Sequence, residues 1–147
     1  MGISPTGAKT DTIVPKLYSI VTPTFTVDDV AINETVTFDW IAPASGRFLE
    51  ASIRTQTTTS DPTWAVTNAT DSTNIVAAEN MPASATTRTV AAASLTNRNF
   101  DKGDVIRVQI VADAVDDVAE GVCVVLTAVL TDHVVAAAAA PDFYKNF

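Results

Sequence analysis

The sequence has very few of the residues on which most enzyme mechanisms depend. It contains one cysteine, Cys123, and one histidine, His133, in 147 residues. A single cysteine excludes a disulfide framework within the chain and a thiolate-rich zinc site. A single histidine excludes the metal motifs that need two histidines. We therefore expect no metal and no other cofactor, and we expect the protein not to be an enzyme.

Basic residues and long apolar runs are also scarce. Nine Lys and Arg stand against 17 Asp and Glu, which gives a net charge of −8. Nucleic-acid binding depends on clustered basic side chains, so we expect no nucleic acid partner. No apolar run approaches the roughly 18 residues that cross a membrane, and the N-terminus has no basic stretch before an apolar core. We expect neither membrane association nor a secretion signal.

The residues that dominate the chain are small or β-branched. The sequence holds 23 Ala, 22 Thr and 19 Val, and 47% of its residues are hydrophobic whereas 18% are charged. Valine and threonine favour the pleated, half-buried surface of a sheet. A chain of this length normally forms one domain. The composition therefore predicts a single all-β domain.

Alternation of apolar and polar residues locates the strands. Residues 35–41 place Val36, Phe38 and Trp40 on one face, and residues 48–55 offer Leu49, Ala51 and Ile53. The turn residues between these two runs predict that they form a hairpin. Further strands are expected at 64–66, 74–77, 87–93, 104–111 and 121–130. About eight strands of irregular length predict a β-sandwich or jelly roll.

The apolar run 121–130 is nearly continuous, so we expect it to lie centrally with both faces covered. We expect Trp40 in the core because it alternates with Phe38. We expect Trp64 to be partly exposed because it begins a strand after a loop. A lone exposed tryptophan could stack on a sugar ring.

The chain divides into an extended N-terminal arm (1–30), a sandwich or jelly-roll core (31–132) and a C-terminal tail (133–147). Three prolines interrupt the arm, and three aromatic residues stand among the last five residues of the tail. The arm is either a flexible terminus or a partner-binding segment, and the tail either packs on its own domain or contacts a neighbouring subunit. The candidate partner-binding residues are Leu17, Tyr18, Ile20, Phe25, Phe143, Tyr144 and Phe147.

Two further groups of residues are candidates, one for metal binding and one for catalysis. Asp113, Asp116, Asp117 and Glu120 form an acidic connector whose oxygens could bind calcium, although it lacks the alternating frame that wraps such an ion. The favoured interpretation is a solvated loop. Cys123 lies within an apolar strand, where a thiol is typically inert, so its pairing with His133 is a weak candidate for catalysis.

The arrangement resembles the small capsid decoration, or cement, proteins of tailed bacteriophages. The resemblance is carried by the paired runs 35–41 and 48–55, by the residues Phe100-Asp101-Lys102-Gly103-Asp104 leading into 105–111, and by the two terminal segments. It implies a dimer or trimer that binds the major capsid protein on the outer surface of the virion. Alternatives are another phage component (tail, fibre or head-fibre) and a carbohydrate-binding or adhesive jelly-roll module.

Overall fold

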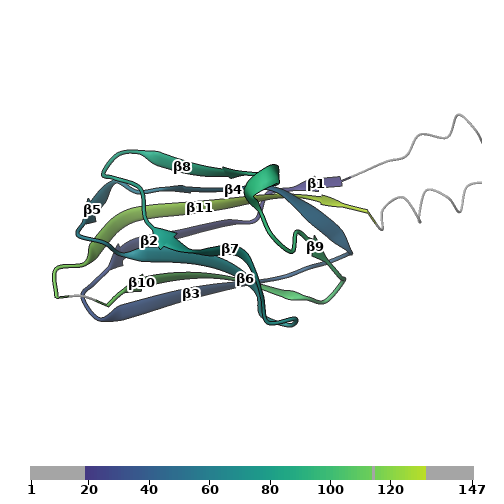
Figure 1. Cartoon of the computed structure of the whole chain (residues 1–147), viewed down its shortest axis with the longest axis horizontal. Helices are drawn as coiled ribbons and strands as arrows, with labels where there is room; N and C mark the ends of the chain where they lie inside the picture. Colours follow the sequence, from purple (N-terminus) through teal and green to yellow (C-terminus); the bar gives the residue numbers. More distant parts are fainter. Residues whose placement is uncertain (1–18, 114, 132–147) are drawn as a thin grey trace, which may run out of the picture.

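The computed structural model describes residues 19–113 and 115–131, and these form a β-sandwich (Figure 1). One 3-10 turn, η1 (Ala92–Ser94), interrupts the strands. In the described part of the chain no helix is long and apolar enough to cross a membrane. The strands are β1 (Ser19–Val21), β2 (Thr24–Val30), β3 (Glu34–Ile41), β4 (Gly46–Arg54), β5 (Thr57–Thr59), β6 (Thr63–Asn68), β7 (Thr73–Asn80), β8 (Thr87–Ala91), β9 (Asn99–Phe100), β10 (Val105–Ala112) and β11 (Val118–Leu130).

The order of the strands identifies the sandwich as a jelly roll. Taking only the strands of five or more residues, one sheet has the order β2–β11–β4–β8 and the other has the order β3–β10–β6–β7. The pairs β2–β11, β3–β10, β4–β8 and β6–β7 are all antiparallel, as in one long hairpin wrapped into two sheets. The short strands β1, β5 and β9 extend the first sheet to seven strands. The predicted all-β sandwich or jelly roll is therefore confirmed.

The predicted hairpin between residues 35–41 and 48–55 is wrong. Strand β3 pairs with β10 in the four-stranded sheet, whereas β4 pairs with β11, β8 and β9 in the seven-stranded sheet. The connection crosses between the sheets and is held by Ala42, whose N–H donates to Asp104 O at 2.9 Å and whose carbonyl accepts the Gly103 N–H at 2.8 Å. A turn signal does not distinguish such a crossing from a hairpin.

A β-bulge alters the inward face of β4. The register against β11 shifts between Thr127 and Ala128, so that Glu50 and Phe48 oppose consecutive residues and Leu49 is left over. Ala51 and Ile53 point into the core as predicted, but the buried residue before them is Phe48, and Leu49 is only half-buried. A bulge adds one residue and so inverts the alternation on its far side.

Strand β11 is central within its sheet, but only one of its faces is fully buried. Val122, Val124 and Leu126 are at most 2% exposed, whereas Cys123 and Val125 on the other face are half-buried. The prediction that both faces are covered is therefore wrong for the described part of the chain. The neighbouring side chains on β4 and β2 shield the outer face only in part.

Residues 19–30, which we expected to belong to the N-terminal arm, form strands β1 and β2 on the edge of the seven-stranded sheet. Pro23 lies in the break between them, where its missing N–H costs no ladder bond, and its carbonyl accepts the Leu126 N–H at 2.9 Å. The remainder of the arm, 1–18, and the tail, 133–147, lie outside the described residues.

Candidate interaction surface

One edge of the sandwich leaves its apolar side chains half-buried. Strands β1 and β2 form this edge of the seven-stranded sheet, and β3 forms the matching edge of the four-stranded sheet. Phe25 of β2 stacks on Phe38 of β3 with ring centroids 5.5 Å apart, and Trp40 meets Phe100 edge-on at 5.6 Å. We call this edge the seam. It consists of the half-buried residues Val21, Phe25, Val27, Val36, Phe38 and Trp40.

Large exposed hydrophobic residues flank the seam. Ile20 on β1 is 64% exposed, Ile32 in the turn before β3 is 46% exposed, and Ile41 at the end of β3 is 66% exposed. Among the described residues only one other large hydrophobic residue is this exposed, Val115 in the loop between β10 and β11. Ile20 and Ile41 lie toward one end of the seam and Ile32 lies at the other, so the continuous apolar surface is that of the half-buried seam residues themselves. Continuous rather than singly scattered apolar surface is typical of an interaction site.

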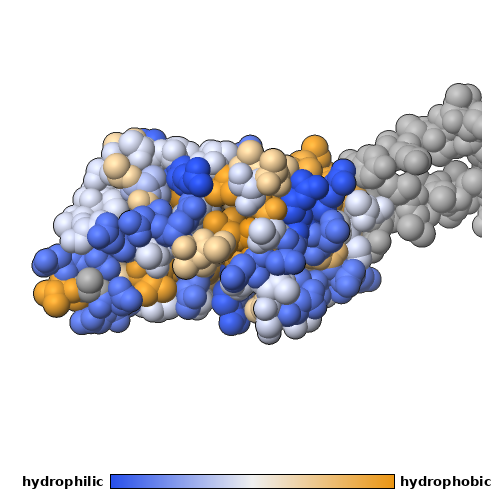
Figure 2. Space-filling view, viewed as in Figure 1, coloured by the Kyte–Doolittle hydropathy of each residue, from blue (hydrophilic) through white to orange (hydrophobic). Residues whose placement is uncertain are grey.

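The opposite edge, between β7 and β8, is closed by contrast. Arg88 of β8 reaches across to Glu79 of β7, with Nε 2.9 Å from Oε1, and the same carboxylate oxygen accepts the Trp64 Nε1–H at 3.2 Å. Figure 2 views the molecule from this side and shows an apolar area between hydrophilic ones. The large apolar side chains of this edge are no more than 7% exposed: Ile75, Val76, Met81, Val90 and Leu95. The seam is therefore the less completely covered edge.

One of the candidate partner-binding residues belongs to the seam, and a second flanks it. Phe25 belongs to it, and Ile20 flanks it on β1. Leu17, Tyr18, Phe143, Tyr144 and Phe147 lie outside the described residues. Val36 and Phe38 were not among the candidates, because their alternation marks an inward face without showing that β3 lies at an edge. The glutamate, aspartates and threonines on β2 and β3 were the available signal, since edge strands often carry such residues.

Both ends of the described chain lie at the same end of the sandwich (Figure 1). Ser19 is opposite Leu130 in the ladder between β1 and β11. The Thr131 N–H donates to Ser45 O at 2.8 Å, which fixes the last described residue to the connection between β3 and β4. The arm and the tail therefore start from neighbouring positions.

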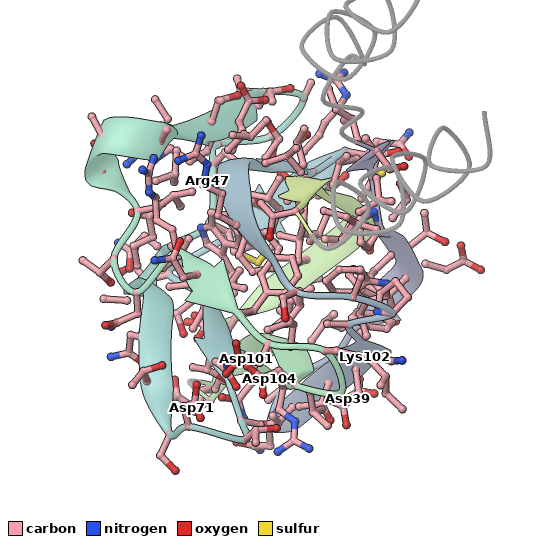
Figure 3. The ribbon with its side chains drawn as sticks, turned by 90° about the vertical axis from the view of Figure 1, so that its right-hand side faces the viewer. Asp39, Arg47, Asp71, Asp101, Lys102 and Asp104 are labelled. Atoms are coloured by element: carbon pink, nitrogen blue, oxygen red, sulfur yellow. The ribbon has the colours of Figure 1, made fainter. Side chains whose placement is uncertain are left out.

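A buried polar cluster fastens the loops at this end. Asn68 is 1% exposed, and its Nδ2 donates to Asp104 Oδ2 at 2.7 Å and to Asp71 Oδ2 at 3.1 Å. Its Oδ1 accepts the N–H groups of Thr70 and Asp71, and Asp104 Oδ2 also accepts the Asp101 N–H at 3.0 Å. Figure 3 shows the three aspartates together at this end. These hydrogen bonds join the loops at this end of the sandwich, so the cluster has a structural role.

We expect Asp104→Ala to lower the free energy of unfolding by about 1–3 kcal/mol, because the Asn68 amide and the Asp101 N–H lose their acceptor in a buried site. Urea denaturation measures the change. Asp113→Ala, at an exposed position after β10, is the control and is expected to change stability by less than about 0.5 kcal/mol. Equal midpoints for the two variants would contradict the structural role of Asp104.

The candidates for chemistry find little support in the structure. Asp113, Asp116 and Glu120 are exposed, whereas Asp117 is 1% exposed and its Oδ1 accepts the Asp61 N–H at 3.0 Å. The acidic connector is therefore not uniformly solvated, since Asp117 anchors it. Within residues 19–113 and 115–131 no group of three or more His, Cys, Asp or Glu side chains could hold a metal ion. Cys123 is a half-buried free thiol, and His133 lies outside the described residues.

The expected positions of the two tryptophans are reversed. Trp64 is 0% exposed, so it offers no face to a sugar, whereas Trp40 is half-buried at the seam. Trp64 is the second residue of β6, whose neighbours β10 and β7 cover it on both sides within the sheet. Trp40 belongs to the edge strand β3, which has a neighbour on one side only among the described strands.

No protein-family model matches the sequence, and no curated protein matches it. Among solved structures, the chain is similar to one in the capsid asymmetric unit of cyanophage Pam1, with a TM-score of 0.49 and 13% identity over 77% of this chain and 84% of that chain. It is also similar to a chain from disulfide-linked pili that form Bacillus endospore appendages, with a TM-score of 0.36 and 18% identity over 78% and 91% of the two chains.

A third similar structure is that of infectious bursal disease virus, Gx strain, with a TM-score of 0.34 and 16% identity over 78% of this chain and 32% of that chain. Two of these three structures are thus viral. At these TM-scores the similarities assign neither a family nor a function to this chain, and the jelly-roll topology rests on the strand order described above.

Proposed function

We propose that the protein is a non-enzymatic structural component of a virus particle. Specifically, we propose a capsid decoration protein that binds the outer surface of the shell and bridges neighbouring major capsid subunits. The observation that carries the proposal is the register of β1 with β11, in which Ser19 is opposite Leu130. Two terminal segments of 18 and 16 residues therefore start from one end of a compact body.

The composition of these segments suits attachment to a large partner. The last five residues hold Phe143, Tyr144 and Phe147, and residues 1–18 end in Leu17 and Tyr18. Fully extended, segments of this length span about 50–60 Å at ~3.3 Å per residue, which is more than the width of a small domain. Segments that order on binding can cover large surfaces and contact several partners, so one protein could join adjacent subunits.

The charge of the body is consistent with a position on the outside of a shell. Residues 19–131 contain six Lys and Arg against 14 Asp and Glu, which gives −8, whereas residues 1–18 carry +1 and residues 132–147 carry −1. A strongly acidic body is repelled by packed nucleic acid. The outer surface, rather than the interior, is therefore the proposed location.

The jelly-roll fold is compatible with a capsid decoration role, but the fold alone does not indicate this role. Viral capsid domains, lectin domains and cupins share the fold, so function has to be argued from a site. The buried Trp64 removes the aromatic platform on which the carbohydrate-binding alternative depended. No observation favours a tail or fibre location over the shell, so these locations are outcomes of the experiment.

The experiment is electron microscopy of the native source particle, with the protein labelled by a specific antibody. We expect label on the shell at regular lattice positions. Label confined to tails or fibres would overturn the decoration role while retaining a virion role. Absence from every particle would overturn both.

A binding assay tests the role of the tail. Shells purified without the protein are mixed with the full chain, with a chain lacking residues 141–147, or with Val115→Ser. We expect the deletion to weaken shell binding at least tenfold, because it removes three aromatic side chains, each of which would bury about 150–250 Å². Val115 lies in the loop at the other end of β11 and serves as the control, with unchanged binding expected. Full affinity without the tail would overturn its role.

A further inference from the structure

The seam lies between two edge strands whose outer backbone groups have no partner strand in the described part of the chain. Strand β2 pairs only with β11, and β3 pairs only with β10. The β3–β10 register runs without a bulge over eight residues, from Glu34 to Ile41. A flat edge strand that presents free N–H and C=O groups is a template for adding another strand. The seam thus offers both main-chain bonding and apolar side chains.

The charge around the seam selects for a basic or neutral ligand strand. Strands β1, β2 and β3 contain no Lys or Arg and carry Asp28, Asp29, Glu34 and Asp39. Asp39 is paired with Arg107 of β10, Oδ1 to Nε at 2.8 Å, and this hydrogen bond lowers the pKa of the Asp39 carboxyl. The other three carboxylates form no ion pair within residues 19–113 and 115–131. The rim of the seam is therefore acidic.

The N-terminal segment of this protein has the matching chemistry. Residues 1–18 carry Lys9 and Lys16 against Asp11, and they end in the apolar stretch Ile13-Val14-Pro15-Lys16-Leu17-Tyr18. The last residue of the segment adjoins the seam, because residue 18 is followed directly by β1. Its 18 residues reach about 59 Å when extended, about twice the ~27 Å length of an eight-residue strand. Both its length and its composition suit a strand laid along the seam.

The direction of β1 indicates that the seam receives this segment from a second copy. Strands β1 and β2 follow one another along β11, with β1 at the end of the sandwich. Residues 1–18 precede β1, so they could lie along the seam of their own copy only if the chain reversed direction close to Ser19. A two-residue hairpin turn, which would reverse the chain into an adjacent strand, uses Gly, Asn or Asp, and residues 12–22 contain none of these. A segment that continues away from its own body reaches a neighbour instead.

We propose that residues 1–18 of one copy bind along the seam of another, as an added strand on the outer edge of β3, where Pro5 and Pro15 are tolerated because an added strand is itself an edge strand. The apolar residues of the arm cover Phe25, Phe38 and Trp40, and Lys9 and Lys16 lie near the acidic rim. The protein is then self-associated through its arms. This inference does not rest on the proposed function, because it concerns the purified protein in the absence of shells.

The first test compares the full chain with a chain lacking residues 1–18, by sedimentation velocity at micromolar concentration. The deletion stops before β1, so the described strands are retained. We expect the full chain to sediment as an oligomer and the deletion variant as a monomer. A monomeric full chain would overturn the proposal, because the arm would then bind in cis or not at all. An oligomeric deletion variant would overturn it equally.

The second test uses a fluorescent peptide of residues 1–18, titrated with the deletion variant. We expect saturable binding that weakens about tenfold in the double variant Val27→Thr, Val36→Thr, which makes the seam more polar at nearly constant volume. Val111→Thr makes the same change at a half-buried position on the outer face of β10 and is the control. Circular dichroism verifies that each variant is folded. Equal peptide binding by the seam variant and the control would overturn the proposal.

Discussion

Replacing Trp64 by alanine is expected to lower the free energy of unfolding by about 3–5 kcal/mol, the range for removing a large aromatic side chain from a core. Trp64 is completely buried on β6, and its Nε1 donates to Glu79 Oε1 at 3.2 Å. The substitution therefore creates a cavity and also removes a hydrogen bond from the edge between β7 and β8. Urea denaturation followed by circular dichroism measures the loss, and the melting temperature should fall by more than about 10 °C.

Trp40→Ala is the matched control for this prediction. Trp40 is half-buried at the seam, where it contacts Phe48 and Phe100 edge-on. Because a half-buried ring leaves a smaller cavity, we expect a loss clearly below that of Trp64→Ala. A larger loss at Trp40 would mean that the tryptophan buried in the core is Trp40, and that the placement of β3 at an edge is wrong.

Gly46→Ala is expected to destabilise the protein by about 3 kcal/mol or more, near the upper limit for overpacking. A Cβ at this position would overlap Val129 O and would lie 2.8 Å from Phe100 Cζ. The carbonyl belongs to β11, which pairs with β4 at this point, so relief requires the two strands to separate. Thermal unfolding of the variant measures the effect.

Gly103→Ala separates this steric effect from the effect of backbone conformation. Gly103 has a φ of +90°, but a Cβ there would meet nothing within 4 Å. The substitution therefore costs only the strain of a left-handed residue, about 1–2 kcal/mol. If Gly46→Ala were no more harmful than Gly103→Ala, the close approach of β4 and β11 at Val129 would be contradicted.

The strands were predictable from the sequence because alternation depends on local geometry. Residues 105–111 and 121–130 belong to β10 and β11, and the two short runs around Trp64 and Ile75 belong to β6 and β7. Pairing was less predictable, because it joins residues far apart in the chain. The turn at 42–45 has the composition of a hairpin, yet jelly-roll topology requires it to cross between sheets. Likewise, nothing near Leu49 signals the bulge that moves Phe48 into the core.

The candidate surface was predictable only in part, for a related reason. Phe25 and Ile20 were selected because they stand in a proline-interrupted segment. Phe38 and Trp40 were assigned to the core because periodicity identifies the inward face of a strand. Whether an inward side chain is fully covered depends on whether its strand has a neighbour on each side. That property is set by the β3–β10 and β2–β11 pairings, which span most of the chain.

The pairing of β2 with β11 has a consequence for how the chain folds. Val30 is opposite Ala119 and Phe25 is opposite Val124. The first long strand, β2, therefore cannot pair until the last strand, β11, has been synthesised. During translation, β2 and β4 both lack the central strand that joins them, and their apolar faces stay uncovered until β11 leaves the ribosome. Folds dominated by such distant pairings form in milliseconds to seconds rather than microseconds. Emergence of β11 is therefore expected to be the committing event of folding, and chains that terminate before residue 118 should accumulate as aggregates or degradation products.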